Sequence, residues 1–255
     1  MAKFQSRASR VIRTRAITSV VILTAIILTA ILRWDDNRVS VGTSPPLELT
    51  SGKLADPSQS VRLLVIGDST SNDADEWVSL TAQHLADSKG RMVAMTTWEP
   101  DTERFGREII LAGSGRPITI INFSSPGATP PYNLLRLSKV AADRPDLVIV
   151  NQGHNSPDVE AEVGALVTEL RQLWPQPPEI AVIDQNPRTD DPNQSQAAAV
   201  GMDALADSHP YIELVDVRSA FRSNGGAELL TDGLHPNSEG SHLWARTVWA
   251  ALGIS

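Results

Sequence analysis

Residues 61–70 read VRLLVIGDST, and this stretch decides the class of fold. A nearly continuous apolar run, Val61 to Ile66, ends in the polar turn Gly67-Asp68-Ser69-Thr70. An apolar run without alternation is typical of a strand that is covered on both faces, as in a parallel sheet. In such sheets ligands bind beyond the carboxyl ends of the strands, so the turn lies where chemistry is expected.

Five more apolar runs follow along the chain, and helical patterns separate them. The six expected strands are residues 61–66, 92–98, 118–123, 147–151, 180–184 and 211–217. Between or after them, apolar side chains share one helical face in three sets: Val78, Ala82 and Leu85; Val163, Val167 and Leu170; Trp244, Val248 and Leu252. This alternation predicts an α/β fold, a three-layer α/β/α sandwich around a parallel sheet.

Ser69 is the first candidate for catalysis. A serine at a strand-to-helix turn can be exposed beside helix N-terminal amides, which help to stabilise an oxyanion. We expect the helix to begin near Ala74. Taken alone, Gly-Asp-Ser is more typical of a turn with a helix-capping serine than of a nucleophile.

The segment Thr231-Asp232-Gly233-Leu234-His235-Pro236-Asn237 supplies what a serine nucleophile needs. Serine reacts only when a base takes its proton, and histidine suits that role near neutral pH. An aspartate three residues earlier can accept the other imidazole N–H and orient the ring. An Asx-turn followed by a capping asparagine would explain the Asp, Gly, Pro and Asn, but not the histidine.

Two middle loops offer donors for an oxyanion. Residues 122–129 read NFSSPGAT and residues 151–155 read NQGHN. The Gly127 amide and the Asn155 side chain suit that role, although Gly127 could be a turn glycine and Asn155 a helix cap. His154, beside Asn155, is a candidate substrate neighbour.

Together these blocks resemble the SGNH hydrolases, also called GDSL-type esterases and lipases. They occur in family order as residues 67–70, 122–127, 153–155 and 232–237. The resemblance implies a flavodoxin-like sheet of about five parallel strands. It also implies that Ser69 is the nucleophile, that His235 and Asp232 complete a triad, and that Gly127 and Asn155 join the Ser69 amide in the oxyanion hole.

Three positions depart from the family pattern. Thr70 replaces the leucine of the name-giving motif, Ser156 stands where many members have aspartate, and Ser124 stands where some have glycine. None of these changes removes a catalytic group. Residues 96–117 carry no motif, and their charged side chains favour a solvated connection over a substrate lid.

The composition limits the classes of partner and cofactor that this chain is expected to bind. The 255 residues are 41% hydrophobic, which allows one sizeable core, and no cysteine is present for disulfides or thiol catalysis. Five basic residues lie in residues 1–15, which leaves 17 basic against 30 acidic residues elsewhere, a net charge of −13. Such a domain repels phosphate backbones, so nucleic acid is not an expected partner. No spacing typical of a metal site occurs, and neither metal nor cofactor is expected.

The N-terminal part predicts membrane attachment. Residues 1–15 form a basic, cytoplasmic segment, and residues 16–32 are apolar apart from four hydroxyl side chains. Their length favours a transmembrane signal-anchor, and a cleaved signal peptide is the alternative. The positive-inside rule then places the rest of the chain outside the cytoplasm. Residues 33–60, rich in Ser, Pro, Gly and Thr, are interpreted as a linker to a hydrolase domain over 61–255.

These patterns together predict an extracytoplasmic serine esterase that uses an acyl-enzyme on Ser69. Acetyl or acyl esters of envelope glycans or lipids are the expected substrates. An O-acyltransferase with the same acyl-enzyme and a catalytically silent glycan- or lipid-binding module are the alternatives. Protein partners and the oligomeric state are not predicted.

Overall fold

The computed structural model describes residues 47–111 and 113–255, and its centre is one mixed β-sheet. The strands are β1 (Val61–Gly67), β2 (Arg91–Glu99), β3 (Arg104–Phe105), β4 (Ile109–Leu111), β5 (Ser114–Ser124), β6 (Leu147–Asn151), β7 (Glu179–Asp184) and β8 (Ile212–Asp216). Their order is β3-β2-β5-β1-β6-β7-β8, with β4 paired to β2. The expected segments outside the described residues are 1–15, 16–32 and residues 33–46 of the linker.

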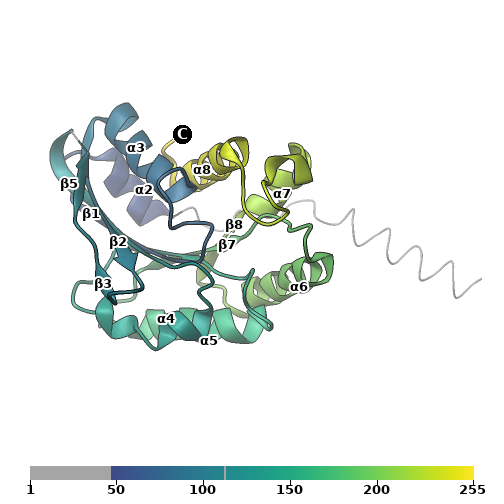
Figure 1. Cartoon of the computed structure of the whole chain (residues 1–255). Helices are drawn as coiled ribbons and strands as arrows, with labels where there is room; N and C mark the ends of the chain where they lie inside the picture. The colour runs from purple at the N-terminus through teal and green to yellow at the C-terminus, as the bar shows by residue number, and fades with distance from the viewer. Residues whose placement is uncertain (1–46, 112) are drawn as a thin grey trace, which may run out of the picture. The chain divides into compact units, whose positions relative to one another are not determined.

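Helices cover both faces of this sheet, as predicted for a three-layer sandwich (Figure 1). One face carries α2 (Glu48–Ala55), α3 (Trp77–Lys89), α7 (Val217–Ser223) and α8 (Ser238–Leu252). The other carries α4 (Pro130–Leu134), α5 (Val159–Gln172) and α6 (Pro192–Ser208). Two 3-10 turns, η1 (Leu137–Lys139) and η2 (Gly226–Leu229), complete the described elements. None of the helices in the described ranges is long and apolar enough to span a bilayer.

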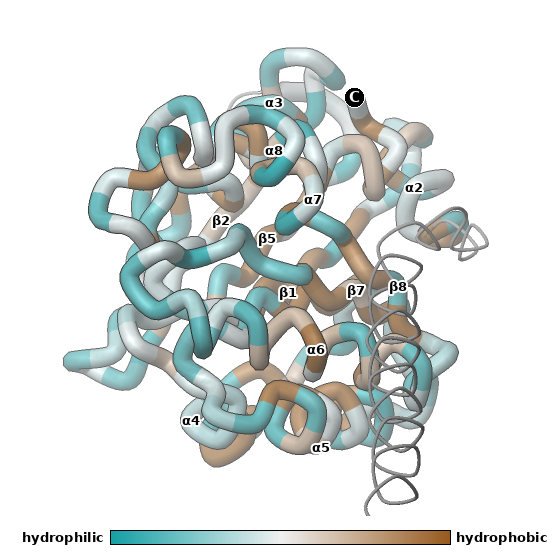
Figure 2. The backbone as a smooth tube through the Cα atoms, turned by 90° about the vertical axis from the view of Figure 1, so that its right-hand side faces the viewer, coloured by the Kyte–Doolittle hydropathy of each residue, from teal (hydrophilic) through white to brown (hydrophobic). Residues whose placement is uncertain are grey.

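The two cores explain why the strands are apolar without alternation. Leu63 and Val65 of β1 pack with α3 and α8, whereas Leu64 and Ile66 pack with α5 and α6 on the opposite face. In Figure 2 much of the tube at β1 and β7 has the brown colour of hydrophobic residues. All six expected strands form, and all nine side chains of the three helical sets are buried. The parallel part of the sheet thus has six strands, one more than the family resemblance implied.

The segment expected to be a solvated connection is exposed, but it is ordered into strands. Residues 100–104 and 107–110 are exposed, while β3 and β4 pair antiparallel with β2 along its outer edge. Arg136, which lies just after α4, donates to the Glu103 carboxylate (2.8 Å) and so ties the β2–β3 turn to this helix. Cross-strand pairing therefore orders a segment whose composition alone indicates a loop.

The linker prediction is wrong for residues 47–60, because α2 belongs to the folded domain. Leu47 and Leu54 are buried against the α3/α8 core. The Glu179 carboxylate accepts hydrogen bonds from the first-turn amides of Leu49 (3.2 Å) and Thr50 (2.8 Å). At the other end, the buried Arg91 guanidinium donates to the Leu54 carbonyl (3.0 Å). Partners distant in the sequence therefore cap both ends of this helix.

Two leucines of α2 provide a matched test of that packing. Leu54 is 2% exposed and Leu49 is 72% exposed. Leu54→Ala is expected to lower the free energy of unfolding by about 2–5 kcal/mol, because it removes buried methyl groups and leaves a cavity. Leu49→Ala should change it by less than about 0.5 kcal/mol. Denaturant unfolding of both variants measures the difference, and equal effects would show that α2 does not pack on the domain.

Candidate active site

Ser69, His235 and Asp232 form one hydrogen-bonded chain at the carboxyl edge of the sheet. Ser69 Oγ lies 2.9 Å from His235 Nε2, and His235 Nδ1 lies 2.8 Å from Asp232 Oδ2. Ser69 and His235 are 166 positions apart in the sequence, so the fold alone brings them together. A carboxylate can only accept, so Nδ1 carries the proton and Nε2 presents its lone pair to the serine hydroxyl.

Asp232 is held by more than the imidazole. Its Oδ1 accepts hydrogen bonds from the backbone N–H groups of Leu234 (3.0 Å) and His235 (2.8 Å). The hydrogen bonds from the His235 ring and backbone hold the pKa of Asp232 well below its usual range. The carboxylate, whose side chain is 55% exposed, therefore stays ionised, and it can orient His235 and stabilise the imidazolium that forms during catalysis.

The loop that carries this pair lies farther along the chain than expected. The sequence places it directly after the last strand, but α7 and η2 come between β8 and Leu230. A bridge between Leu230 and Pro236 and a hydrogen bond from Thr231 N to His235 O (2.8 Å) close the loop. Asn237 then accepts from Gly240 N (3.0 Å) and caps α8. The expected capping role of Asn237 is present together with the pairing of Asp232 and His235.

Ser69 lies in a turn rather than at the start of α3, which corrects the expected helix boundary near Ala74. The helix begins at Trp77, and Ser69 caps no helix. The Asp68 carboxylate accepts from Thr70 N (3.0 Å) and Thr70 Oγ1 (2.7 Å), which holds the turn. Short polar side chains in this turn hydrogen-bond to the nearby backbone, which competes with helix formation, so the helix begins later in the sequence.

Gly127 and Asn155 approach each other as oxyanion donors should. Gly127 has a φ of +68°, a conformation that favours glycine, and nothing lies within 4 Å of where a Cβ would be. Asn155 Nδ2 donates to Ala128 O (3.2 Å), one residue past Gly127. The cap of α5 is Asp158, not Asn155. Within residues 47–111 and 113–255 the backbone N–H groups of Ser69 and Gly127 make no hydrogen bond, so both can serve an oxyanion.

His154 is brought into the site region but is 3% exposed. Its Nε2 lies 2.9 Å from Asn186 O, and burial lowers the pKa of the ring. A neutral ring with the proton on Nε2 fits this contact, because a carbonyl only accepts. The ring of His154 is thus buried and bound to the segment that follows β7, one residue before Asn155.

Glu76, half-buried at the N-cap of α3, gives the region a pH dependence. It accepts from Asp73 N (2.8 Å), and burial raises the pKa of Glu76 to about 8. An acid with a raised pKa contributes stability that is present below its unfolded pKa, about 4.3, and is lost as pH rises through the folded value. Glu76→Gln stays neutral and keeps an acceptor for Asp73.

This variant should therefore match the wild type near pH 4 and be more stable by about 1–2 kcal/mol near pH 9, a value reduced for partial exposure. Denaturant unfolding at the two pH values measures the effect. A stability difference that does not change with pH would contradict the protonated state of Glu76.

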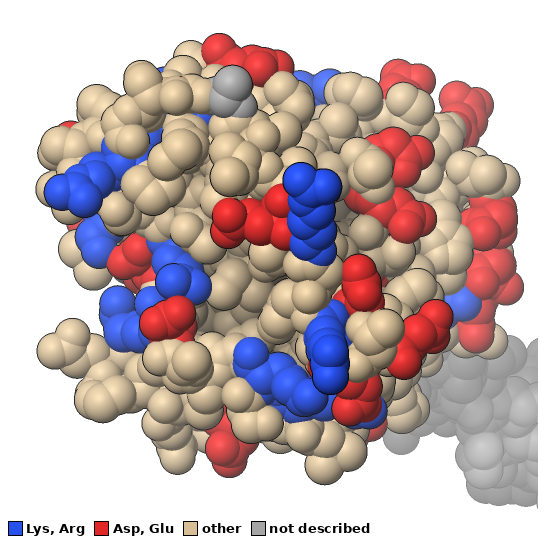
Figure 3. Space-filling model, turned by 60° about the vertical axis from the view of Figure 1, so that its left-hand side comes forward, with Lys and Arg blue, Asp and Glu red and all other residues tan. Residues whose placement is uncertain are grey.

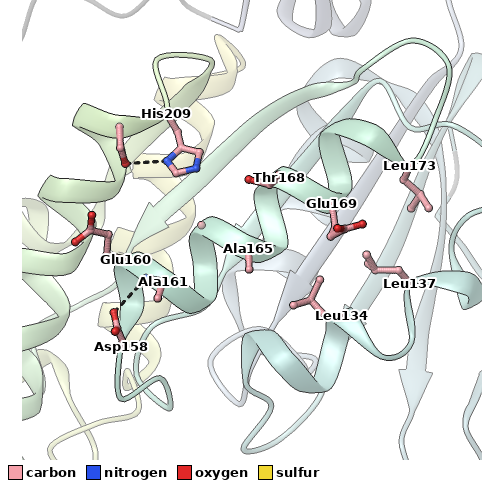
Figure 4. A pocket seen from close by; sticks show the side chains of 12 residues that line it. Leu134, Leu137, Asp158, Glu160, Ala161, Ala165, Thr168, Glu169, Leu173 and His209 are labelled. Atoms are coloured by element: carbon pink, nitrogen blue, oxygen red, sulfur yellow. Dashed lines mark hydrogen bonds between the residues drawn. The ribbon is translucent and has the colours of Figure 1, made fainter.

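The cavity of about 950 Å³ shown in Figure 4 lies away from the triad. It is an open groove over α5, between Leu134 of α4 and His209 beyond the end of α6. None of the candidate catalytic residues lines it. In the described part of the chain, no three His, Asp or Glu side chains are grouped to hold a metal ion.

A serine hydroxyl, an imidazole and a carboxylate in one hydrogen-bonded chain define the site of a serine hydrolase. Residues 65–243 match the GDSL-like Lipase/Acylhydrolase family. The chain belongs to this family, as the resemblance predicted, and it is a carboxylic ester hydrolase. A comparison with curated proteins gave no match.

Solved structures share the fold at low sequence identity. A lipase/acylhydrolase from Enterococcus faecalis matches with a TM-score of 0.56 and 17% identity, over 76% of this chain and 96% of that chain. A psychrotrophic esterase from Pseudoalteromonas sp. matches with a TM-score of 0.53 and 18% identity, over 75% and 96%. A catalytic mutant of an acetylxylan esterase from Geobacillus stearothermophilus matches with a TM-score of 0.54 and 18% identity, over 76% and 95%.

Proposed function

We propose that this chain is an extracytoplasmic serine esterase that hydrolyses acetyl or other short acyl esters of envelope glycans through an acyl-enzyme on Ser69. The observation that carries the proposal is the hydrogen-bonded chain from Ser69 Oγ through His235 to Asp232, at 2.9 and 2.8 Å. A binding module would not need all three groups in this geometry.

The reaction follows from these contacts in two steps. Ser69 Oγ attacks the ester carbonyl while His235 Nε2 takes its proton, and the Ser69 and Gly127 amides with the Asn155 side chain stabilise the oxyanion. His235 gives the proton to the leaving alcohol as the ester bond breaks. Water then loses a proton to His235 and attacks the acyl-serine. The acid leaves, the proton returns to Ser69, and the enzyme is restored.

The openness of the site favours a short acyl group on a bulky polar alcohol. The side chains of His235 and Asp232 are 37% and 55% exposed, and the grooves over α5 and α6 contain neither residue. Long acyl chains need an apolar channel, whereas a glycan can reach an open edge. The acetylxylan esterase among the structural neighbours supports this choice. On the face in Figure 3, basic and acidic side chains are interspersed, without one basic patch for a polyanion.

Location is inferred from residues 1–32, which lie outside the described part. Within the described domain, α2 is the first element of the chain. It binds at the amino edge of the sheet. Lys53 pairs with Asp146 just before β6 (2.6 Å), and Glu179 at the start of β7 receives the α2 amides. Ser69 is at the opposite, carboxyl edge. The described chain therefore enters the domain at the edge of the sheet opposite Ser69.

A chain-length series tests the substrate. The full-length chain is assayed on p-nitrophenyl acetate, butyrate and octanoate, and on an acetylated glycan with release of acetate measured. We expect kcat/KM to fall as the acyl chain lengthens, and acetate to be released from the glycan. A rate that rises with chain length would contradict the glycan proposal and favour lipid esters. A C-terminal reporter that is active only outside the cytoplasm tests the location.

The same open site admits a second candidate, an O-acyltransferase. Because His235 and Asp232 are exposed, a sugar hydroxyl has the same access to the acyl-serine as water. Adding candidate sugar acceptors to the ester assay distinguishes the reactions. Free acid as the main product supports the esterase, whereas an acylated acceptor as the main product identifies a transferase.

A further inference from the structure

The loop that follows β7, Gln185–Thr189, contacts the immediate neighbours of every catalytic side chain. No motif marks this loop, and the mechanism above gives it no role. On the nucleophile side, Gln185 Nε2 donates to Asp68 Oδ2 (3.0 Å) and lies 3.3 Å from Thr70 Oγ1. Asp68 and Thr70 flank Ser69, and Gln185 is 2% exposed. One buried side chain, 117 positions from Asp68, thus holds the nucleophile turn.

The same loop holds the residue before the oxyanion donor Asn155. The backbone N–H of His154 donates to Gln185 Oε1 (2.8 Å), and its ring donates to Asn186 O (2.9 Å). Arg188 Nη1 donates to the His154 carbonyl (2.9 Å). All hydrogen-bonding groups of His154 except Nδ1 are therefore bound to the β7 loop, which fixes the start of the Asn155 turn.

On the base side, Asn186 Nδ2 donates to Leu234 O (3.0 Å), and Thr189 N donates to Gly233 O (2.7 Å). Leu234 precedes His235 and Gly233 follows Asp232. The partners decide which side-chain amide atom is nitrogen and which is oxygen in Gln185 and Asn186. Asp68 Oδ2 and Leu234 O can only accept a hydrogen bond, and His154 N can only donate one. Asn186 is fully buried.

We propose that Gln185 and Asn186 are positioning residues. They hold the three loops that carry Ser69, Asn155 and His235 in fixed positions relative to one another. The proposal rests on the esterase function above. The three loops come from distant parts of the chain, after β1, after β6 and after η2, whereas Ser69, Asn155 and His235 must be held within about 0.5 Å of their productive positions. A misplacement of about 1 Å can lower a rate by about 100-fold. The alternative is that these bonds only satisfy buried polar groups and so act on stability alone.

Two substitutions of similar size remove the links in the full-length chain. Gln185→Met deletes the bonds to Asp68 and His154, and Asn186→Leu deletes the bond to Leu234. We expect each to lower kcat for p-nitrophenyl acetate by about 10- to 100-fold with KM changed less than about three-fold. The rate of Ser69 labelling by a fluorophosphonate probe should fall by a similar factor, because that reaction needs the same three loops.

Thr81→Val is the matched control. Thr81 is buried between α3 and α8, where its hydroxyl donates to Trp77 O (2.7 Å) and accepts from Trp249 Nε1 (3.0 Å). Its loss should lower the unfolding midpoint while kcat stays within about two-fold of the wild type. If the Gln185 and Asn186 variants behave in the same way, with full kcat per folded molecule, the proposal is overturned.

Gln185→Glu gives a reversible version of the test and replaces Gln185→Met should that variant fail to fold. A protonated carboxyl group at this position can donate to Asp68 and accept from His154 N, as the glutamine does. An ionised carboxylate has no proton to donate and faces the Asp68 carboxylate. His154 and Arg188 are further titratable groups beside this position. The kcat of Gln185→Glu relative to wild type should be close to one at low pH and fall as pH rises. A ratio that is constant with pH contradicts positioning. A wild type that neither hydrolyses esters nor reacts with the probe refutes the esterase itself.

Discussion

Replacing Ser69 with alanine is expected to lower kcat for ester hydrolysis by about four to six orders of magnitude, with little change in stability. The hydroxyl is the only group of the triad that bonds covalently to the substrate, and Ser69 Oγ is already 2.9 Å from its base. Without it, only the oxyanion donors and substrate binding remain, and these contribute about 10³–10⁴ over water.

The loss is measured as initial rates on p-nitrophenyl acetate, with unfolding followed to show that Ser69→Ala folds. Ser79→Ala is the control, because this serine lies in α3 and its hydroxyl donates only to Asp73 O (3.1 Å). It should keep the wild-type rate. A reduction of ten-fold or less in Ser69→Ala would show that another group attacks the ester.

Replacing His235 with alanine is expected to cause a loss of similar size, and combining it with Ser69→Ala should cause no further loss. Serine and histidine act as one unit, because the base has no function without the proton it removes. The matched control is His242→Ala. His242 lies seven residues later in α8, its Nδ1 lies 2.7 Å from Ser238 O, and among the described residues it makes no hydrogen bond to the triad.

Rates of the two single variants and of the double variant measure this coupling. Losses that multiply in the double variant would mean that Ser69 and His235 act independently, which is incompatible with the hydrogen bond between them. A large loss in His242→Ala would mean that the base lies on α8 and is not His235.

Much of the fold could be predicted because its decisive signals are local. Strands buried on both faces carry unbroken apolar runs, as in Val61 to Ile66, and all six such runs form strands. Asp232 and His235 could be paired because three residues of spacing let one loop bring a carboxylate back to its imidazole. Their meeting with Ser69 required only that both loops lie at the carboxyl edge of one sheet.

What could not be predicted depends on contacts between distant residues. The sequence of α2, ELTSGKLA, contains an interior Ser-Gly pair and few apolar residues, so it indicates a linker. Glu179 and Arg91 stabilise its ends, and neither partner is visible from the local sequence. The start of α7 has a signal in the sequence, because Asp216 is a typical helix-capping residue. In the structure it caps this helix by accepting from Ser219 N (2.8 Å).

The β7 loop shows the same limit within the site. Gln185 and Asn186 follow a buried strand at the reactive edge, a position that could have marked them, but their residue types suit many roles. Only the structure shows that their amides bind Asp68, His154 and Leu234. It likewise shows that His154, predicted as a possible substrate neighbour, is buried with its ring bound to Asn186 O.

The most direct test of the serine mechanism is covalent labelling of the wild-type chain with a fluorophosphonate probe, followed by mass spectrometry of the digested protein. A single adduct on Ser69, absent in Ser69→Ala and much slower to form in His235→Ala, is the result we predict. No adduct, or an adduct on another serine that persists in Ser69→Ala, would contradict the assignment of Ser69 as the nucleophile.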